Sequence, residues 1–586
     1  MKHARFCLLM AGVVFGPGRS VAAPAFVRLS ATEDPSTSMG VAWTTLSGPA
    51  ETTVEYGTAK GSYTKKAKGK ATNVSATLGT VSEVTLTGLA PDTVYHYRVG
   101  GAAGGFSGEY SFRTAPAPSE QCGTLRFAVF GDSRAEEWQG DKGVSDAWIA
   151  QSAVALKGSP RFILHGGDIV HDGDAQKQWV NHLKGTEPVS ALVPIMYTIG
   201  NHDTGPVAGD GANYNRIFHL PRADKALGGS GTEDYYFFTW GNAIFVSLST
   251  ESFSGGTPKF KDQADWLDKV LTQNPKRWRF VILHRPIYTH RIDIFSLDLG
   301  HPPDEAGQNA ALVPVITKHH VDIVLQSHNH FYERYAPSKC QNGGSNQPCP
   351  VASFDQGTVH ITTGGAGAFR LWCFFPAICP GPTNQVRLTA SSEHHWLQFD
   401  VKDHTLSMTA TDINGQTIDA FTIKKTVQTP DPCAVAPPPD AGPPPDAAVK
   451  ADTSGAADAK GAADTGGEDT SAADTSAKDT TTGADTKTTP PTADGCGCRV
   501  GRAGAPPALA LLGLFAALGL WARRRSAKGD VGSRSHVYTD GARGGEPLED
   551  QRPTTVLDDR HRPGNAGVSS LDCFRGRNDG SQSGET

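Results

Sequence analysis

Five short polar blocks follow one another through the middle of this chain, and each comes at the end of an apolar run of strand-like composition. The strand-like runs alternate with stretches of helical periodicity, which predicts a sheet covered by helices. In such folds ligands collect at the carboxyl ends of the strands, where all five blocks fall. The blocks are GDSR at 131–134, GDIVH at 167–171, GNHD at 200–203, VILH at 281–284 and SHNH at 327–330.

This alternation predicts an α/β catalytic domain over residues 122–426, in which β-sheets are layered with helices. Apolar runs without intervening helices follow the last polar block and are expected to close the domain. The expected strands are 125–130, 162–165, 243–247, 280–283, 321–325, 358–363, 395–401, 405–411 and 417–424, and the expected helices are 146–157, 174–184, 261–271 and 306–318.

Residues 24–116 have a different pattern, in which short alternating strands are separated by turn signals. This spacing favours an all-β sandwich, with Trp43 and Tyr97 in its core. The run LAPDTVYHYRV at 89–99 resembles part of a fibronectin type III-like module. The expected strands are 40–43, 53–56, 83–86 and 94–99.

Both ends of the chain predict export and anchoring. Residues 1–22 combine a basic start, a short apolar run and small residues before a cleavage site, which is typical of a signal peptide. Residues 429–495 are rich in Pro, Ala, Asp and Thr and lack aromatic residues, so we expect a disordered spacer. Residues 496–525 contain a CGC motif, a transmembrane helix and an arginine cluster, and resemble the C-terminal sorting segment of myxobacterial surface proteins. A disordered tail is expected at 526–586, and the catalytic part is expected in the periplasm or at the cell surface.

The chain has ten cysteines, and export would place those of the catalytic part in an oxidising compartment. A clasp between Cys122 and Cys433 is one option, because sequence alone does not fix the connectivity. The expected local pairs are Cys340 with Cys349 and Cys373 with Cys379.

The net charge of −6 and the lack of a long basic stretch give no support for nucleic-acid binding.

The five blocks provide hard oxygen donors and imidazole nitrogens, which suit zinc, iron or manganese. Two adjacent metals can bind a phosphate, generate hydroxide near neutral pH and stabilise both ends of an in-line displacement. One such block is a weak signal, whereas five in order at strand ends are a strong one. The candidate ligands are Asp132, Asp168, Asn201, His284, His328 and His330.

On these residues the chain resembles the calcineurin-like metallophosphoesterase superfamily, and within it the purple acid phosphatases. The sandwich that precedes the catalytic domain and the run SHNHFYER at 327–334 carry much of this resemblance. It implies a phosphatase that hydrolyses phosphate monoesters by attack of a metal-activated hydroxide, and the predicted signal peptide makes this an exported phosphatase. The alternatives are a phosphodiesterase or nucleotide hydrolase using the same site, and a surface binding protein with an inactive metal site.

The resemblance also implies residue roles. His202 would donate a proton to the leaving oxygen and Asp203 would orient it, with His290 as a second candidate near the leaving group. Asp168 would bridge the two metals. The first metal would be held by Asp132, Asp168, His171 and His330, and the second by Asp168, Asn201, His284 and His328.

Two positions depart from the family pattern. His171 stands where purple acid phosphatases carry the tyrosine that binds ferric iron and gives the colour, so we expect a nitrogen ligand, easier acceptance of zinc, manganese or ferrous iron, and no purple absorption band. Arg134 stands where many superfamily members have a histidine ligand. Arginine is a poor metal ligand because it stays protonated. We therefore expect Arg134 to bind a phosphate oxygen, the alternative being an ion pair with a carboxylate.

Overall fold

The structure is a computed structural model that describes residues 23–434, apart from 208, 252–259, 290–292, 295–296, 299–306, 341–347, 371–385 and 428. All described residues lie in one of two compact units of the chain, Met1–Lys450. The predicted signal peptide, the anchor segment, the tail and most of the spacer lie outside them. Within the described part, no helix has both the length and the apolar character needed to cross a bilayer.

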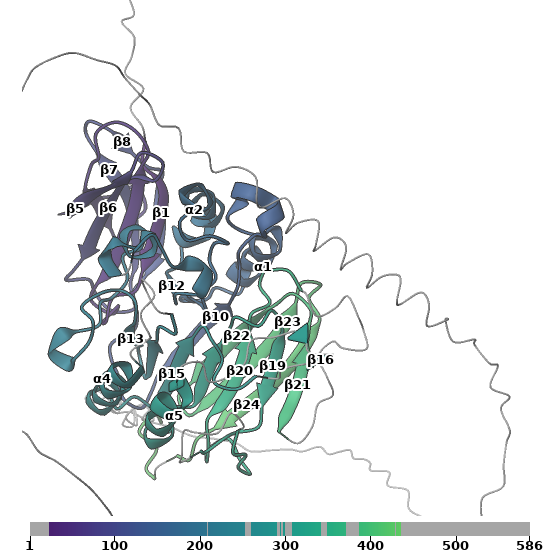
Figure 1. Ribbon diagram of the computed structural model, residues 1–586. Coiled ribbons are helices and arrows are strands. Elements are labelled where there is room, and N and C mark those ends of the chain that lie inside the picture. The colour runs from purple at the N-terminus through teal and green to yellow at the C-terminus, as the bar shows by residue number, and fades with distance from the viewer. Residues whose placement is uncertain are drawn as a thin grey trace, which may run out of the picture. The chain divides into compact units, whose positions relative to one another are not determined.

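The first part of the unit is a sandwich of two antiparallel sheets, drawn in purple in Figure 1. One sheet has the strand order β1-β2-β6-β5, and the other has the order β4-β3-β7-β8 with β9 paired to β7. Trp43 and Tyr97 are completely buried in its core, as predicted. The strands are β1 (Ala25–Ser30), β2 (Met39–Thr45), β3 (Thr53–Gly57), β4 (Lys65–Lys68), β5 (Lys70–Ser75), β6 (Gly79–Leu86), β7 (Val94–Gly101), β8 (Gly105–Phe106) and β9 (Tyr110–Arg113).

Two mixed sheets form the second part. The six-stranded sheet has the order β12-β11-β10-β22-β23-β24 and the seven-stranded sheet the order β13-β14-β15-β18-β20-β19-β21. The Phe127 ring joins them, with its centroid 5.1 Å from that of Phe245 and 5.2 Å from that of Phe280. The strands are β10 (Thr124–Phe130), β11 (Ile163–His165), β12 (Ile195–Tyr197), β13 (Tyr236–Trp240), β14 (Ala243–Ser247), β15 (Trp278–Leu283), β18 (Ile323–Gln326), β19 (Tyr332–Tyr335), β20 (Val359–Thr363), β21 (Arg387–Ser391), β22 (His395–Lys402), β23 (Thr405–Asp412) and β24 (Thr417–Lys424), with β16 (Asp293–Ile294) and β17 (Leu297–Asp298) as a separate pair.

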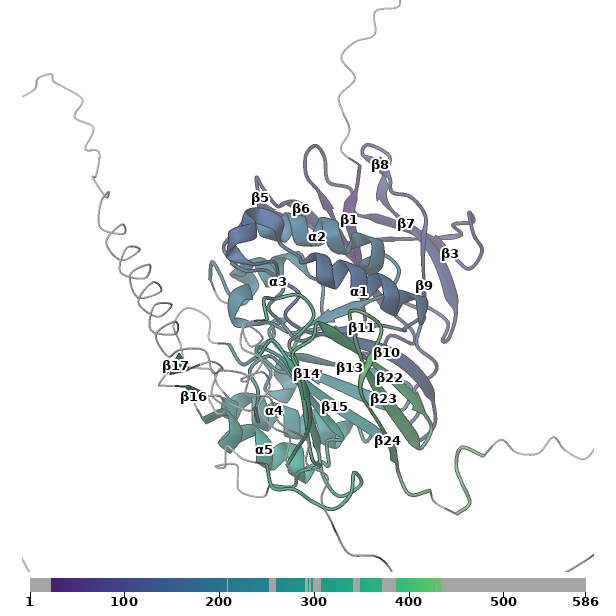
Figure 2. The same cartoon turned by 90° about the vertical axis from the view of Figure 1, so that its right-hand side faces the viewer.

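Helices cover the outer faces of these sheets (Figure 2). α1 begins where the Ser145 side chain accepts a hydrogen bond from the Trp148 amide, a typical N-cap, and Trp148 packs against Phe130 of the six-stranded sheet. Trp266 and Leu312 of two other helices pack in the apolar cluster on the seven-stranded sheet. The helices are α1 (Asp146–Lys157), α2 (Gln176–Ser190), α3 (Asn213–Ile217), α4 (Phe260–Gln273) and α5 (Gln308–Lys318).

α2 also joins the sheets to the sandwich. The Tyr97 hydroxyl donates to the Ala191 carbonyl at 2.7 Å, just after the helix ends, and Glu187 accepts a hydrogen bond from the Val27 amide at 3.1 Å. These contacts are buried or half-buried. The sandwich and the catalytic part therefore pack against each other through a shared interface.

Disulfides join Cys122 to Cys433 and Cys340 to Cys349, which confirms both predicted pairings. The first links the segment before β10 to the segment after β24, and therefore closes the catalytic part at its two ends. Cys373 and Cys379 lie outside the described residues.

Candidate metal centre

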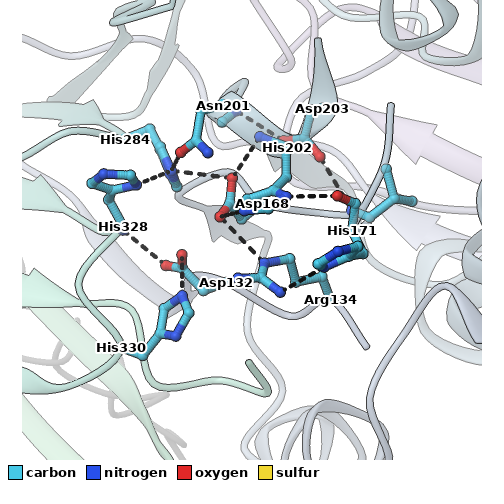
Figure 3. A network of polar contacts seen from close by, with 12 residues as sticks. Asp132, Arg134, Asp168, His171, Asn201, His202, Asp203, His284, His328 and His330 are labelled. Atoms are coloured by element: carbon cyan, nitrogen blue, oxygen red, sulfur yellow. Dashed lines mark hydrogen bonds and ion pairs between the residues drawn. The ribbon is translucent and has the colours of Figure 1, made fainter. Parts of the chain in front are cut away.

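The five polar blocks meet where parallel strands of both sheets end. Asp132, Asp168 and Asn201 follow β10, β11 and β12, which are neighbours in the six-stranded sheet. His284 and His328 follow β15 and β18, which are neighbours in the seven-stranded sheet. Figure 3 shows these side chains pointing toward one another. The stacking of the two sheets therefore assembles a site that neither sheet contains alone.

The turns that carry three of these residues are strained. Asp132, Asp168 and His328 have φ angles of 57°, 54° and 68°. Such left-handed conformations cost roughly 1–2 kcal/mol each in residues other than glycine, and they concentrate at functional sites. Gly167 has a φ of 95°, and a Cβ there would lie 2.7 Å from the Nδ1 of His284. The glycine of this Gly-Asp block is thus required by the close approach of the two loops.

One group of donor atoms surrounds the Nε2 of His284. This nitrogen lies 3.1 Å from Asp168 Oδ1, 3.1 Å from Asn201 Oδ1 and 3.1 Å from His328 Nδ1. Ligand atoms of Asp168, His284 and His328 all lie within 4.8 Å of one another. An ion at their centre would receive carboxylate, amide and imidazole donors, a mixture that suits zinc, iron or manganese.

A second group contains Asp132, Asp168 and His330, whose ligand atoms also lie within 4.8 Å of one another. The Nε2 of His330 lies 3.5 Å from Asp132 Oδ1, which is buried and accepts no hydrogen bond from the described residues. A buried carboxylate oxygen in this state requires an explanation such as an ion. Because Asp168 belongs to both groups, the residues fit two metal ions that share one carboxylate.

Backbone carbonyls orient two of the imidazole rings. The Nδ1 of His284 lies 2.8 Å from the Gly166 carbonyl oxygen, and the Nδ1 of His330 lies 2.9 Å from the Phe369 carbonyl oxygen. A carbonyl can only accept, so Nδ1 carries a proton in both rings and Nε2 is the nitrogen that faces the site. Metal-binding histidines are commonly held in this way.

Burial and mutual charge determine the ionisation of these groups. Burial raises the pKa of Asp132. Burial would also raise the pKa of Asp168, but the charge of His284 holds it well below its usual range. For His284, burial disfavours the proton, yet the neighbouring Asp168 carboxylate raises its pKa to about 10. A metal ion would take the place of that proton, because imidazole binds metals only when it is neutral.

His202 lies beside Asp168. Its backbone amide donates to Asp168 Oδ1 at 3.1 Å, and its ring Nδ1 donates to the His171 carbonyl at 2.6 Å. The second ring nitrogen, Nε2, lies 3.9 Å from Asp168 Oδ2, and the side chain is 28% exposed. This nitrogen can therefore exchange a proton with a substrate.

Asp203 does not touch the His202 ring, contrary to its predicted role. Its carboxylate accepts hydrogen bonds from the backbone amides of Ile169 at 2.7 Å, Val170 at 3.1 Å and Gly200 at 2.8 Å. Burial, reinforced by the charge of Asp168, raises the pKa of Asp203 to about 8. Asp203 thus holds two ligand-bearing turns together, while the His171 carbonyl orients the ring of His202.

Arg134 lies at the edge of the site and is only 6% exposed. Its guanidinium contacts Asp168 Oδ2 at 3.4 Å and His171 Nδ1 at 3.0 Å (Figure 3). It also contacts Glu136 Oε1 at 3.1 Å. This is the ion pair with carboxylates that we considered as the alternative to binding a phosphate oxygen. Among the described residues, His171 contributes no atom to either group of donors.

Glu136 was not predicted from the sequence, although its position two residues after Arg134 is a usable signal. Its Oε1 also accepts a hydrogen bond from the Phe369 amide at 2.6 Å, and the Phe369 carbonyl orients His330. Glu136 therefore links Arg134 to the loop that positions a candidate ligand.

A cavity of about 580 Å³ opens beside His202. It is large enough for a small organic phosphate. His290, the second candidate proton donor, lies outside the described residues. The cavity is lined by Glu137, Gly140, Asp141, His171, Asp172, Gly173, Ala175, Gln178, Asn201, His202 and Thr204.

Comparison with known proteins agrees with this geometry. Residues 125–332 match the calcineurin-like phosphoesterase family, which makes the chain a metal-dependent phosphoric ester hydrolase of that superfamily. Residues 24–114 match the purple acid phosphatase N-terminal domain. With both domains in this order, the chain belongs with the purple acid phosphatases.

Similar proteins include acid phosphatases of Arabidopsis thaliana and Homo sapiens. The chain is 28% identical to purple acid phosphatase 18 of Arabidopsis thaliana over 377 residues, which covers 63% of this chain and 77% of the relative. It is 28% identical to acid phosphatase type 7 of Homo sapiens over 445 residues, covering 71% and 94%. A further relative, 26% identical over 391 residues, is named probable inactive purple acid phosphatase 1, also of Arabidopsis thaliana.

A solved structure shares the fold. The purple acid phosphatase from yellow lupin seeds superposes with a TM-score of 0.57 at 21% sequence identity, covering 69% of this chain and 74% of the lupin chain. This agreement confirms the predicted sandwich followed by a layered α/β domain.

Proposed function

We propose that this chain is an exported phosphatase that hydrolyses phosphate monoesters with two metal ions. The observation that supports it most is the membership of Asp168 in both groups of donor atoms. When bound, two adjacent ions would neutralise phosphate charge and lower the pKa of water. The proposed ligands are Asp132, Asp168 and His330 for the first ion, and Asp168, Asn201, His284 and His328 for the second.

His202 is the proposed proton donor to the leaving oxygen. Its Nδ1–H is committed to the His171 carbonyl, so Nε2 is the nitrogen that exchanges the catalytic proton. The ring lines the cavity and is partly exposed, which gives a substrate access to it.

Export is supported by the two disulfides, because structural disulfides persist in oxidising compartments. We propose that residues 1–22 direct export and that residues 496–525 anchor the protein in the membrane, with the catalytic part in the periplasm or at the cell surface. Cell fractionation of the full chain, with and without residues 496–525, tests the anchor. Equal release of both forms into the soluble fraction would refute it.

Hydrolysis of p-nitrophenyl phosphate and of its bis ester tests the function. We expect the metal-loaded protein to prefer the monoester, and Asn201→Ala and His328→Ala to lose nearly all turnover. His319→Ala, at the end of α5, is the control and should keep full turnover. Unchanged turnover in the Asn201 or His328 variant would refute the site, and preference for the bis ester would favour the diesterase alternative. Two bound metals without turnover would favour an inactive binding protein.

A further inference from the structure

The contact between Arg134 and His171 determines where the protons of the His171 ring lie. Arg134 Nη1 lies 3.0 Å from His171 Nδ1, and a guanidinium can only donate. Nδ1 of His171 must therefore accept with its lone pair. A neutral imidazole has one such nitrogen, so Nε2 carries the remaining proton. In this arrangement neither ring nitrogen of His171 can bind a metal ion.

Two carboxylates hold Arg134 in this place. Asp168 Oδ2 lies 3.4 Å from Nε and Glu136 Oε1 lies 3.1 Å from Nη1, and the side chain is almost completely buried. Glu136 is itself fixed by the amide of Phe369. Movement of the guanidinium away from His171 would leave buried carboxylate charge unpaired, which is unfavourable. Because arginine does not lose its proton, a rise in pH cannot release the contact.

The position of His171 relative to the two donor groups agrees with this reading. Asp132, Asp168 and His330 form a compact group without it.

We propose that Arg134 is a positioning residue that keeps His171 out of the metal centre. The first metal ion then has three protein ligands and the second has four, so the two sites differ in affinity and the first ion dissociates more readily. This rests on the proposed two-metal site, but it concerns metal affinity and does not require turnover.

The test is a Zn²⁺ titration of the metal-free protein, followed by calorimetry and by metal analysis after dialysis. We expect two sites of unequal affinity in the wild type. His171→Ala should change the zinc affinity of the weaker site by no more than about threefold. His330→Ala is the matched control and should abolish that site, because loss even of an outer-shell partner costs roughly 10–100-fold in affinity. Loss of the weaker zinc in His171→Ala would show that His171 is a ligand and overturn the proposal.

Arg134→Met tests the other side of the contact. Release of His171 should tighten the weaker site by at least about tenfold, and this gain should largely disappear in the double variant Arg134→Met/His171→Ala. An equal gain in both backgrounds would mean that Arg134 acts without His171 and would overturn the proposal. If two zinc ions bind to the wild type but no ester is hydrolysed, the proposed function fails while this assignment stands.

Discussion

Asp168 Oδ1 and His284 Nε2 lie 3.1 Å apart, although the two residues follow strands of different sheets. Asp168 comes after β11 of the six-stranded sheet and His284 after β15 of the seven-stranded sheet. The aromatic core around Phe127 stacks these sheets and so determines the distance between the two ligands. The candidate metal centre is therefore a product of the tertiary packing as much as of its own loops.

Asp168→Asn should weaken both metal sites at once. The amide keeps the size of the side chain but removes the charge that two ions would share. We expect a loss of affinity at each site greater than the roughly 10–100-fold that follows loss of an outer-shell partner. Metal analysis after dialysis measures this, with the surface variant Asp210→Asn as control. Retention of one tightly bound ion would show that Asp168 does not bridge.

His202→Ala should lower turnover by roughly 10²–10⁴-fold for an alkyl phosphate, because the poor leaving group needs a proton. The loss should be much smaller for p-nitrophenyl phosphate, whose leaving group is stable as an anion. Metal content should not change. Steady-state kinetics with both substrates measure the difference, and an equal loss for both would argue against proton donation.

Asp203→Ala should destabilise the fold more than a typical loop substitution. Three buried backbone amides would lose their acceptor. Each unsatisfied group costs about 1–3 kcal/mol, so we expect the free energy of unfolding to fall by at least about 3 kcal/mol. Denaturant unfolding measures it, with Thr204→Ala as a neighbouring control. A loss similar to that of the control would contradict the role of Asp203 in joining the turns.

His360→Leu should make stability less sensitive to acid. His360 is buried on β20, and burial lowers its pKa to about 3. The unfolded imidazole binds a proton near pH 6.5. Between these values the unfolded state binds more protons, so the free energy of unfolding falls as pH falls, by up to roughly 1.4 kcal/mol per pH unit. Above pH 6.5 the imidazole is mostly neutral in both states, so the full free energy of unfolding is present there.

Denaturant unfolding of the wild type and of His360→Leu from pH 7 to pH 4 measures this difference in slope. Other buried histidines contribute equally to both proteins and cancel. Parallel curves would show that His360 is protonated in the folded state or accommodated without cost.

The positions of the candidate ligands Asp132, Asp168 and Asn201 could be read from the sequence because each follows a glycine at the end of an apolar run. Before Asp132 and Asp168 this local pattern predicts both the strand and the turn. The strands at 243–247 and 417–424 were predicted to the residue for a similar reason, since their apolar or alternating character is complete within a few residues. β12, with three residues, is too short to show a period and was missed.

The partners of polar side chains could not be predicted. Arg134 was expected to bind a phosphate oxygen, with an ion pair to a carboxylate as the alternative, and only the structure identifies Asp168 and Glu136 as its partners. Asp203 was expected to contact the neighbouring ring, but the turn of its own backbone brings it to amides from another block. Such contacts depend on loop conformation, which hydrophobic periodicity does not encode.

Turnover measured against bound metal tests the two-metal account most directly. The metal-free protein would be loaded stepwise with whichever of Zn²⁺, Mn²⁺ or Fe²⁺ restores the highest turnover, and phosphate release from p-nitrophenyl phosphate followed at each step. The account predicts little turnover while only the tighter site is filled and full turnover once both sites are occupied. Full turnover with one ion per chain, or none with two, would contradict it.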